Sequence, residues 1–174
     1  MAVDIELTLD EILDGIRFIH LVRENKKQYE VVDKKFDKNN SSYSVNLMGQ
    51  LGEMACGKGL GLQVDRTISP SGDNGHDLST PLGKNIQVKT STLPQLIFNA
   101  PELFISDIAV LVQFFGDKQL PHVDSKFTLI GWVTREIFLA NHYKHDYGYG
   151  TRLVMDANQL QPIEVLIDEI SRLH

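Results

Sequence analysis

Residues 75–91 read GHDLSTPLGKNIQVKTS, and the interpretation of the whole chain starts from this stretch. In its second half, Ile86 and Val88 alternate with Gln87 and Lys89. Alternation with a period of two is typical of a β-strand, whose successive side chains point to opposite faces of the sheet. The sequence therefore predicts a strand over residues 85–91 with one apolar face and one face that carries an amide and an amine.

A tight turn precedes this strand, because Pro81 and Gly83 are typical turn residues. The turn predicts a β-hairpin with Asp77 on one arm and with Gln87 and Lys89 on the other. A carboxylate, an amide oxygen and an ammonium group would then point into the same space. The alternative is a solvated polar face on an edge hairpin, since an aspartate followed by Gln-x-Lys is a loose pattern.

An acidic side chain from an upstream helix is available to join this group. Apolar residues at helical spacing, followed by glycines, predict a helix from Tyr43 to Lys58. These residues are Leu47, Leu51, Met54 and Ala55, then Gly57, Gly59 and Gly61. Glu53 lies off the apolar stripe with Gly49 and Gly57 one turn away, so another element or a ligand can approach it closely. An exposed glutamate on an ordinary helix is the alternative.

The remaining elements are a mixture of helices and strands. Thr8 and Glu11 have the spacing of a capping box before an amphipathic helix from Leu9 to the mid-twenties. Further helices are predicted at Thr134–Asn141 and Gln161–Leu173, and strands at Leu62–Ile68, Ile108–Phe115, Phe127–Val133 and Arg152–Met155. The almost wholly apolar Ile108–Phe115 is expected at the centre of the sheet. Residues 92–106 have no clear assignment, and a short helix interrupted by Pro94 and Pro101 is one interpretation. This order predicts the α/β (α+β) class, with a mixed central β-sheet flanked by helices.

The composition is that of an ordinary globular protein, and its 174 residues predict a single domain with a real core. The single cysteine, Cys56, excludes an internal disulfide and a cysteine zinc cluster, which fits a reducing cytoplasm. No apolar run approaches the length of a membrane span, so no membrane partner is expected. The formal net charge of −6 argues against non-specific coating of nucleic acid, but it does not exclude a local groove for a phosphate backbone.

The residues of the predicted hairpin and helix suit a hard divalent cation such as Mg²⁺, because this ion prefers oxygen ligands. The expected ligands are the carboxylates of Glu53 and Asp77, the amide oxygen of Gln87 and the backbone carbonyl of Val88. Lys89 would orient or help to deprotonate an attacking water and balance charge on a phosphate. The sequence therefore favours metal-assisted hydrolysis of a phosphodiester, with Mn²⁺ as a substitute for Mg²⁺.

Several other polar side chains are candidates for contact with a nucleic acid. They are Thr90 and Ser91 in the strand, Lys34 and Lys35 in a basic stretch, and His142 and Lys144 in an aromatic loop over Asn141–Gly150. The alternatives are a solvated helix end for the basic stretch and plain exposed surface for the loop. The two histidines and the aspartate of that loop match no metal-binding spacing.

Three short motifs together resemble those of the PD-(D/E)XK superfamily, the restriction-endonuclease-like nucleases. They are Gly49-Gln50-Leu51-Gly52-Glu53, His76-Asp77 and Gln87-Val88-Lys89, within a resemblance that spans about Tyr43 to Val133. The resemblance implies a core of helix, three strands, helix and strand (αβββαβ), with N-terminal helix and C-terminal strand and helix packed on it. It also implies Mg²⁺-dependent deoxyribonuclease activity on DNA by Glu53, Asp77, Gln87 and Lys89.

The chain departs from the family pattern at two positions. His76 stands where the family name has a proline, and Gln87 stands where it has an acid, which leaves the site one charge poorer. The superfamily includes restriction enzymes, recombination exonucleases, junction resolvases and repair nickases, so the resemblance supports DNA hydrolysis rather than one biological role. A stand-alone endonuclease of restriction, repair or phage type suits a short chain, and its place would be the cytoplasm of a bacterium or of a phage-infected host cell. A homodimer is compatible with the resemblance.

A second hypothesis is a nuclease-fold domain that has lost catalysis and binds nucleic acid or another protein. Gln87 and the negative net charge favour it. A small-molecule enzyme has less support, because the sequence contains no phosphate loop, dinucleotide fingerprint or nucleophile elbow.

Overall fold

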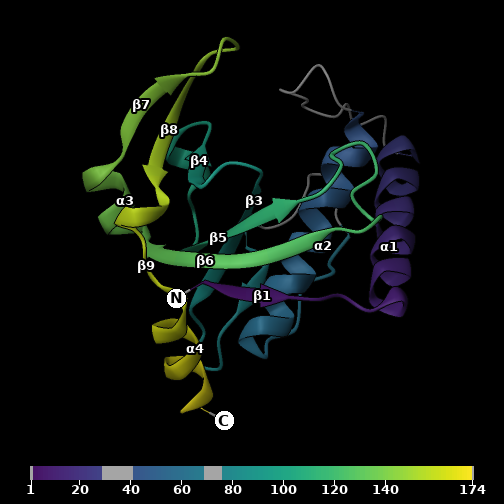
Figure 1. Cartoon of the computed structure of the whole chain (residues 1–174), viewed down its shortest axis with the longest axis horizontal. Helices are drawn as coiled ribbons and strands as arrows, with labels where there is room; N and C mark the ends of the chain where they lie inside the picture. The colour runs from purple at the N-terminus through teal and green to yellow at the C-terminus, as the bar shows by residue number, and fades with distance from the viewer. Residues whose placement is uncertain (1, 29–40, 69–75, 174) are drawn as a thin grey trace.

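The computed structural model of the chain describes residues 2–28, 41–68 and 76–173, which form a mixed α+β fold (Figure 1). In chain order the elements are β1 (Val3–Ile5), α1 (Leu9–Gln28), α2 (Ser42–Leu60), β2 (Leu78–Ser79), β3 (Asn85–Ser91), β4 (Gln95–Phe98), η1 (Pro101–Leu103), β5 (Ile108–Phe115), β6 (Lys126–Thr134), α3 (Arg135–Asn141), β7 (Tyr143–Asp146), β8 (Thr151–Asp156), η2 (Ala157–Gln159), β9 (Gln161–Pro162) and α4 (Ile163–Ser171), where η denotes a 3₁₀-helix. No helix among the described residues has the length and apolar character needed to cross a membrane.

Two sheets organise the described chain. The larger has the order β1-β6-β5-β3-β2, with β9 beside β6, and the smaller has the order β4-β8-β7. Strands β3 and β5 are parallel, whereas the other neighbouring strands of the larger sheet are antiparallel. Strand β5 spans the residues predicted from its apolar run, and its side chains are mostly buried at the centre of the sheet.

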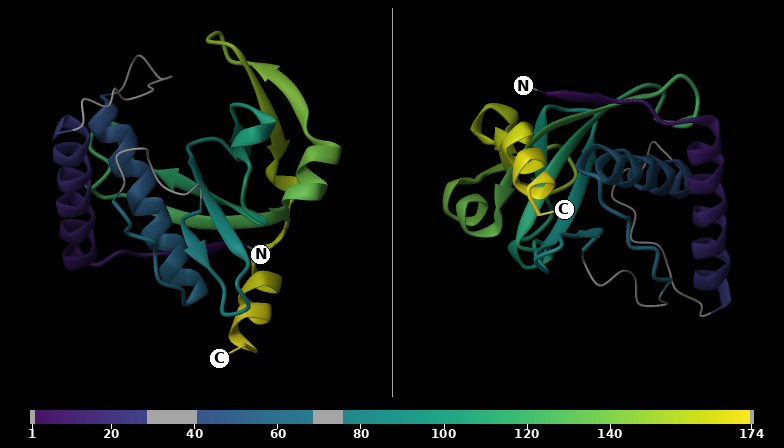
Figure 2. Two further views of the ribbon diagram at one scale, coloured as in Figure 1. Left: turned by 180° about the vertical axis from the view of Figure 1, so that it is seen from behind. Right: turned by 90° about the horizontal axis from the view of Figure 1, so that it is seen from below.

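Each face of the larger sheet carries its own hydrophobic cluster. On one face, α2 packs Leu51 and Ala55 against Ile86 and Val88 of β3. Figure 2 shows α1 outside α2, so that α2 lies between α1 and the sheet. On the other face, the smaller sheet and α3 cover β5 and β6 around stacked and edge-on aromatic rings: Phe98, Phe104 and Phe138.

Local sequence signals set the ends of the first two helices. Thr8 and Glu11 form the predicted capping box, with each backbone N–H donating to the other side chain at 2.6 and 3.2 Å. Helix α2 begins after Ser41, whose hydroxyl accepts from the N–H of Ser44, and it ends at Gly61. Gly61 has a φ of 67°, a left-handed conformation that glycine adopts without strain.

The predicted hairpin around residues 75–91 is confirmed. Strands β2 and β3 pair antiparallel, and a turn closed by two hydrogen bonds between backbone groups of Thr80, Gly83 and Lys84 joins them. The Asp77 N–H donates to the Ile86 carbonyl at 2.8 Å, so the pairing extends one residue before β2. The predictions for β5, β6, α3 and β8 are also confirmed, within one residue at each end.

Several predictions for element boundaries are wrong. Leu62–Ile68 makes only an isolated bridge between Val64 and Leu78, because β2 on the sheet edge is two residues long and cannot support a full ladder. Gly57 and Gly59 lie inside α2 rather than ending it, since close neighbours occupy the space that their side chains would need. The last helix starts at Ile163, because the two residues before it pair with β6 as strand β9.

Three strands form where the sequence gives no strand signal. Strand β1, which pairs with β6, is only three residues long. It is therefore too short to show a period in the sequence. Strand β4 and η1 lie in the unassigned residues 92–106. Strand β7 lies in the segment predicted as an aromatic loop, and it is fixed by pairing with β8 rather than by its own exposed residues.

Helix α2 lies very close to β3 at Gly52. A Cβ atom added there would lie 1.9 Å from the Oγ1 of Thr90. We expect Gly52→Ala to lower the free energy of unfolding by about 1–3 kcal/mol, because the side chain overpacks this contact. Thr90→Ala in the same chain should restore part of the loss. Urea unfolding followed by circular dichroism measures both.

Gly49 is the matched control, since nothing lies within 4 Å of a Cβ added at this position of the same helix. Gly49→Ala should stabilise the protein by roughly 0.5–1 kcal/mol through the helix propensity of alanine. Equal effects of the two substitutions would contradict the close contact between α2 and β3.

Candidate functional site

Asp77 is fixed at the start of the β2–β3 hairpin. Only 7% of the residue is exposed, and its Oδ2 accepts a hydrogen bond of 2.6 Å from the backbone N–H of Val88. The neighbouring Leu78 is fully buried beneath α2, which anchors this arm of the hairpin. The hydrogen bond to Val88 and the burial of Leu78 therefore fix the Asp77 carboxylate beside the backbone of β3.

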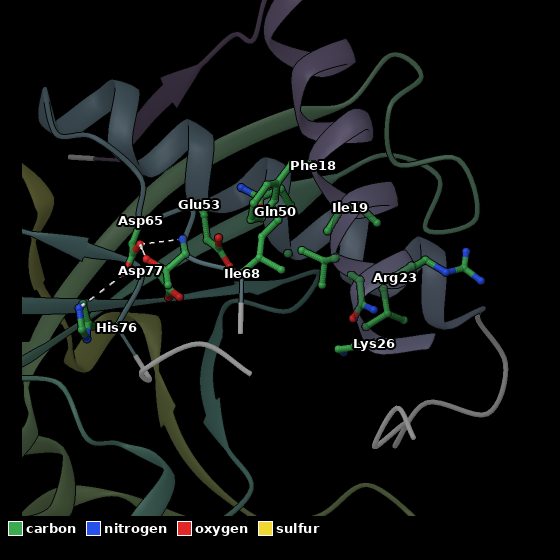
Figure 3. Close-up of a pocket in the computed structure, with 15 residues that line it drawn as sticks. Phe18, Ile19, Arg23, Lys26, Gln50, Glu53, Asp65, Ile68, His76 and Asp77 are labelled. Carbon is green, nitrogen blue, oxygen red and sulfur yellow. Dashed lines mark hydrogen bonds and ion pairs between the residues drawn. The ribbon is translucent and has the colours of Figure 1, made fainter. Parts of the chain in front are cut away.

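Glu53 reaches the same place from α2. Helix α2 lies close to β3 where Gly52 meets Thr90, and the next residue of the helix is Glu53. Glu53 and Asp77 line one cavity of about 360 Å³, and Figure 3 shows their side chains near each other at one end of it. Two carboxylates from separate elements thus converge, as the sequence predicted for this pair.

The charge of this pair acts on Cys56, which lies on α2. Burial raises the pKa of the Cys56 thiol far above its ordinary value, and the negative charges of Asp77 and Glu53 raise it further. The thiol is fully buried. Cys56 is therefore a neutral core residue beside the two acids and not a nucleophile.

Gln87 and Lys89 lie on the face of β3 opposite Ile86 and Val88. Their neighbours on β5 are Ala109 and Leu111, which belong to the hydrophobic cluster opposite α2. The Lys89 ammonium lies 5.0 Å from the centroid of the Phe98 ring in that cluster. Neither residue is among the described residues that line the cavity of Glu53 and Asp77.

The side-chain oxygen of Gln87 is nevertheless a possible ligand atom. It is only 8% exposed, and its Oε1 has no hydrogen-bond partner among the described residues. An unpaired buried carbonyl oxygen is costly, so a bound cation or donor at this atom would be favourable. Val88, between Gln87 and Lys89, is buried and gives its N–H to Asp77. The roles of the Gln87 side chain and of the Val88 carbonyl as ligands stay predictions.

Asp65 and His76 line the same cavity and were not expected there. The Nε2 of His76 lies 3.8 Å from the Oδ2 of Asp65, and the Asp65 N–H donates to the Asp77 carbonyl at 2.8 Å (Figure 3). Two hydrogen bonds to the Asp65 carboxylate lower its pKa. The larger effect comes from the Thr67 hydroxyl and the smaller from the Thr67 N–H. The sequence shows no spacing that would identify Asp65, because an isolated bridge rather than a regular strand brings it beside Asp77.

The other predicted contact residues are scattered. The buried Thr90 hydroxyl faces α2 at Gly52, and the Ser91 hydroxyl accepts from the N–H of Leu93. His142 caps α3 and stacks on the Phe138 ring, whereas Lys144 is exposed on β7. Lys34 and Lys35 lie outside the described residues.

The structure bears on the metal prediction through its donor set. Within residues 2–28, 41–68 and 76–173, no three His, Cys, Asp or Glu side chains form a group that would hold a metal ion. The available donors around β3 are two carboxylates and neutral oxygens. That set is poorer in charge than a dedicated metal cage, but magnesium is commonly held by one or two carboxylates together with water and substrate.

In comparisons with known proteins, no family model matches the chain, and no curated protein matches it in sequence. The functional interpretation therefore rests on the residues and their geometry.

The position of Cys56 predicts how stability changes with pH. Its thiol ionises in the unfolded chain above about pH 8.5 but stays neutral in the folded chain, where its pKa is raised. Its contribution to stability is therefore complete below that pH and is lost as the pH rises, by up to roughly 1.4 kcal/mol per pH unit. Urea unfolding of wild type and of Cys56→Ala, without divalent metal, at several alkaline pH values measures the difference.

The alanine variant loses this titration but keeps every other group, so the two stability profiles should converge as the pH rises. Parallel profiles would show that Cys56 ionises in the folded protein as easily as in the unfolded chain.

Proposed function

We propose that this protein is a metal-dependent nuclease that hydrolyses DNA phosphodiester bonds with a restriction-endonuclease-like core. The observation that carries the proposal is the convergence of Glu53 and Asp77 from two elements on one cavity, with Asp77 fixed on the backbone of Val88. The unpaired buried oxygen of Gln87 on the adjacent residue of β3 supports it.

The order of elements supports the fold assignment in part. Helix α2 is followed by the hairpin β2–β3 and then by β5, which pairs with β3. The expected first strand is reduced to the bridge at Val64, and the segment between β3 and β5 contains β4 and η1 in place of a helix. The part of the core that carries the site residues is therefore the part that agrees best.

The chain supplies each role that the reaction needs. Glu53 and Asp77 would hold a Mg²⁺ ion with their carboxylates, and the Gln87 amide oxygen and the Val88 carbonyl would complete the protein ligands. When bound, the ion would lower the pKa of a water molecule and polarise the phosphoryl oxygen. Lys89 would balance the charge that develops on the phosphate. Its ammonium lies 5.0 Å from the centroid of the Phe98 ring.

A second candidate function is DNA binding without hydrolysis. Gln87 and Lys89 are not among the described residues that line the cavity, which favours this function, because catalysis needs the lysine and the acids at the same phosphate. The neutral side chain of Gln87 also favours weak metal binding.

The first test is a cleavage assay on supercoiled plasmid, linear duplex and single-stranded DNA with Mg²⁺, Mn²⁺ or EDTA. Asp77→Asn and Glu53→Gln should each reduce cleavage by about a hundred-fold or more, because they remove the ligand charge. Asparagine keeps an acceptor for the Val88 N–H, so the hairpin should stay folded.

Glu169→Gln is the matched control, since it makes the same charge change on the exposed surface of α4. It should cleave like wild type. Unchanged cleavage by Asp77→Asn would refute the nuclease site, and metal-independent DNA binding without cleavage would establish the second function.

The charge of residue 87 gives a separate prediction. Gln87→Glu should tighten Mg²⁺ binding by about ten-fold, because an added carboxylate increases the ligand charge. Gln87→Leu should weaken it by removing the oxygen. Isothermal titration calorimetry with Mg²⁺ and Mn²⁺ measures both affinities.

Gln119→Glu adds the same charge on an exposed loop and serves as the control. If it tightens metal binding as much as Gln87→Glu does, then general electrostatic attraction, and not ligation at residue 87, explains the effect.

A further inference from the structure

The cavity beside the two acids extends between α1 and α2 and has a different character at its far end. Apolar side chains form part of its lining there, and Figure 3 shows Phe18 and Ile19 of α1 among them. The apolar lining residues are Phe18, Ile19 and Val22 of α1, Val45 of α2, and Ile68. An apolar chamber that opens onto a polar site is typical of a pocket for a planar organic group.

Gln50 gives this chamber a specific polar contact. It lies one helical turn before Glu53 on α2 and lines the cavity. Only 4% of the residue is exposed, and its Nε2 has no hydrogen-bond partner among the described residues. A buried amide donor without a partner is unfavourable, so a ligand that brings an acceptor to it gains binding energy.

Cations lie on the α1 side of the cavity. Arg23 and Lys26 are among the lining residues, and the Arg23 guanidinium lies 5.3 Å from the centroid of the Tyr43 ring. These side chains carry charge suited to the phosphates that flank a nucleotide. The cavity thus combines an apolar chamber, an amide donor, cations and, at its other end, the two acids.

We infer that this cavity receives the base of one unpaired nucleotide, so that the protein acts on single-stranded DNA or on unpaired segments of DNA. The inference rests on the proposed nuclease function and names its substrate class. Every base has ring nitrogens or carbonyl oxygens that accept from Gln50, and each has apolar faces that pack on the side chains of the chamber.

A paired base cannot make these contacts. Its faces are stacked and its pairing edge is occupied, so it enters a protein pocket only after it leaves the duplex. The net charge of −6 points the same way, since it weakens attachment to a duplex through its backbone alone. Base contacts supply affinity that the overall charge does not.

The inference is tested by fluorescence anisotropy with a short labelled DNA strand, its duplex, the same strand with one abasic site at successive positions, and the RNA strand of the same sequence. Binding is measured in EDTA, so that it does not depend on the metal. The single strand should bind about ten-fold or more tightly than the duplex, and an abasic site at one position should weaken binding by about ten-fold.

Two variants address the cavity. Gln50→Leu removes the amide donor at similar volume and should weaken single-strand binding by about ten-fold without lowering stability, because the lost group has no partner to leave unpaired. Val45→Phe should weaken single-strand binding by filling the chamber from a position that is 36% exposed. Gln119→Leu, on the exposed loop, is the control and should bind like wild type.

The outcomes separate this inference from the proposed function. Duplex binding as tight as single-strand binding, or no effect of Gln50→Leu, would overturn the base pocket even if Asp77-dependent cleavage of duplex DNA is found. Tighter binding of the RNA strand would overturn the assignment to DNA. Binding that depends on Gln50 supports the base pocket, and the absence of Asp77-dependent metal binding in the same preparation would overturn only the nuclease function.

Discussion

The packing of helix α2 on strand β3 is the constraint on which the rest of the site depends. At Gly52 the helix lies so close to Thr90 that there is no room for even a methyl group. Leu51 and Ala55 are fully buried on either side of this contact. The next residue, Glu53, is therefore carried to the start of the hairpin, where Asp77 is fixed on Val88. A bulkier residue would push the helix outward and separate the two acids.

The site brings charged groups and buried polar groups together. Asp77 is almost fully buried. Its charge and that of Glu53 help to raise the pKa of the Cys56 thiol. Gln50 and Gln87 each have a buried amide atom without a partner among the described residues. Buried polar groups are normally paired, so a bound ligand at these two amide atoms would be favourable. A cation suits the oxygens, and an acceptor suits the Gln50 amide.

These groups fall into two sets around strand β3. Glu53 and Gln50 come from α2 and line the cavity together with Asp77, whereas Gln87 and Lys89 are paired with residues of the cluster on the side of the smaller sheet. A hydrolytic enzyme and a binding module would share the first group. In a hydrolytic enzyme, Gln87 and Lys89 would act at the phosphate that the two acids bind, whereas a binding module does not need this. Gln87 and Lys89 are therefore the residues that distinguish the two functions.

Sequence alone determined the hairpin, the buried strand β5, the capped first helix and the identity of Glu53 and Asp77 as a pair. These features are encoded by local patterns: the alternation at residues 85–91, the turn residues Pro81 and Gly83, and the helical spacing around Glu53. Only the tertiary structure decided that Asp65, His76 and Gln50 line the cavity of that pair and that Gln87 and Lys89 are not among the described residues that line it. The physical reason is that a period shows which residues share a face, whereas packing between elements distant in the chain decides what that face meets.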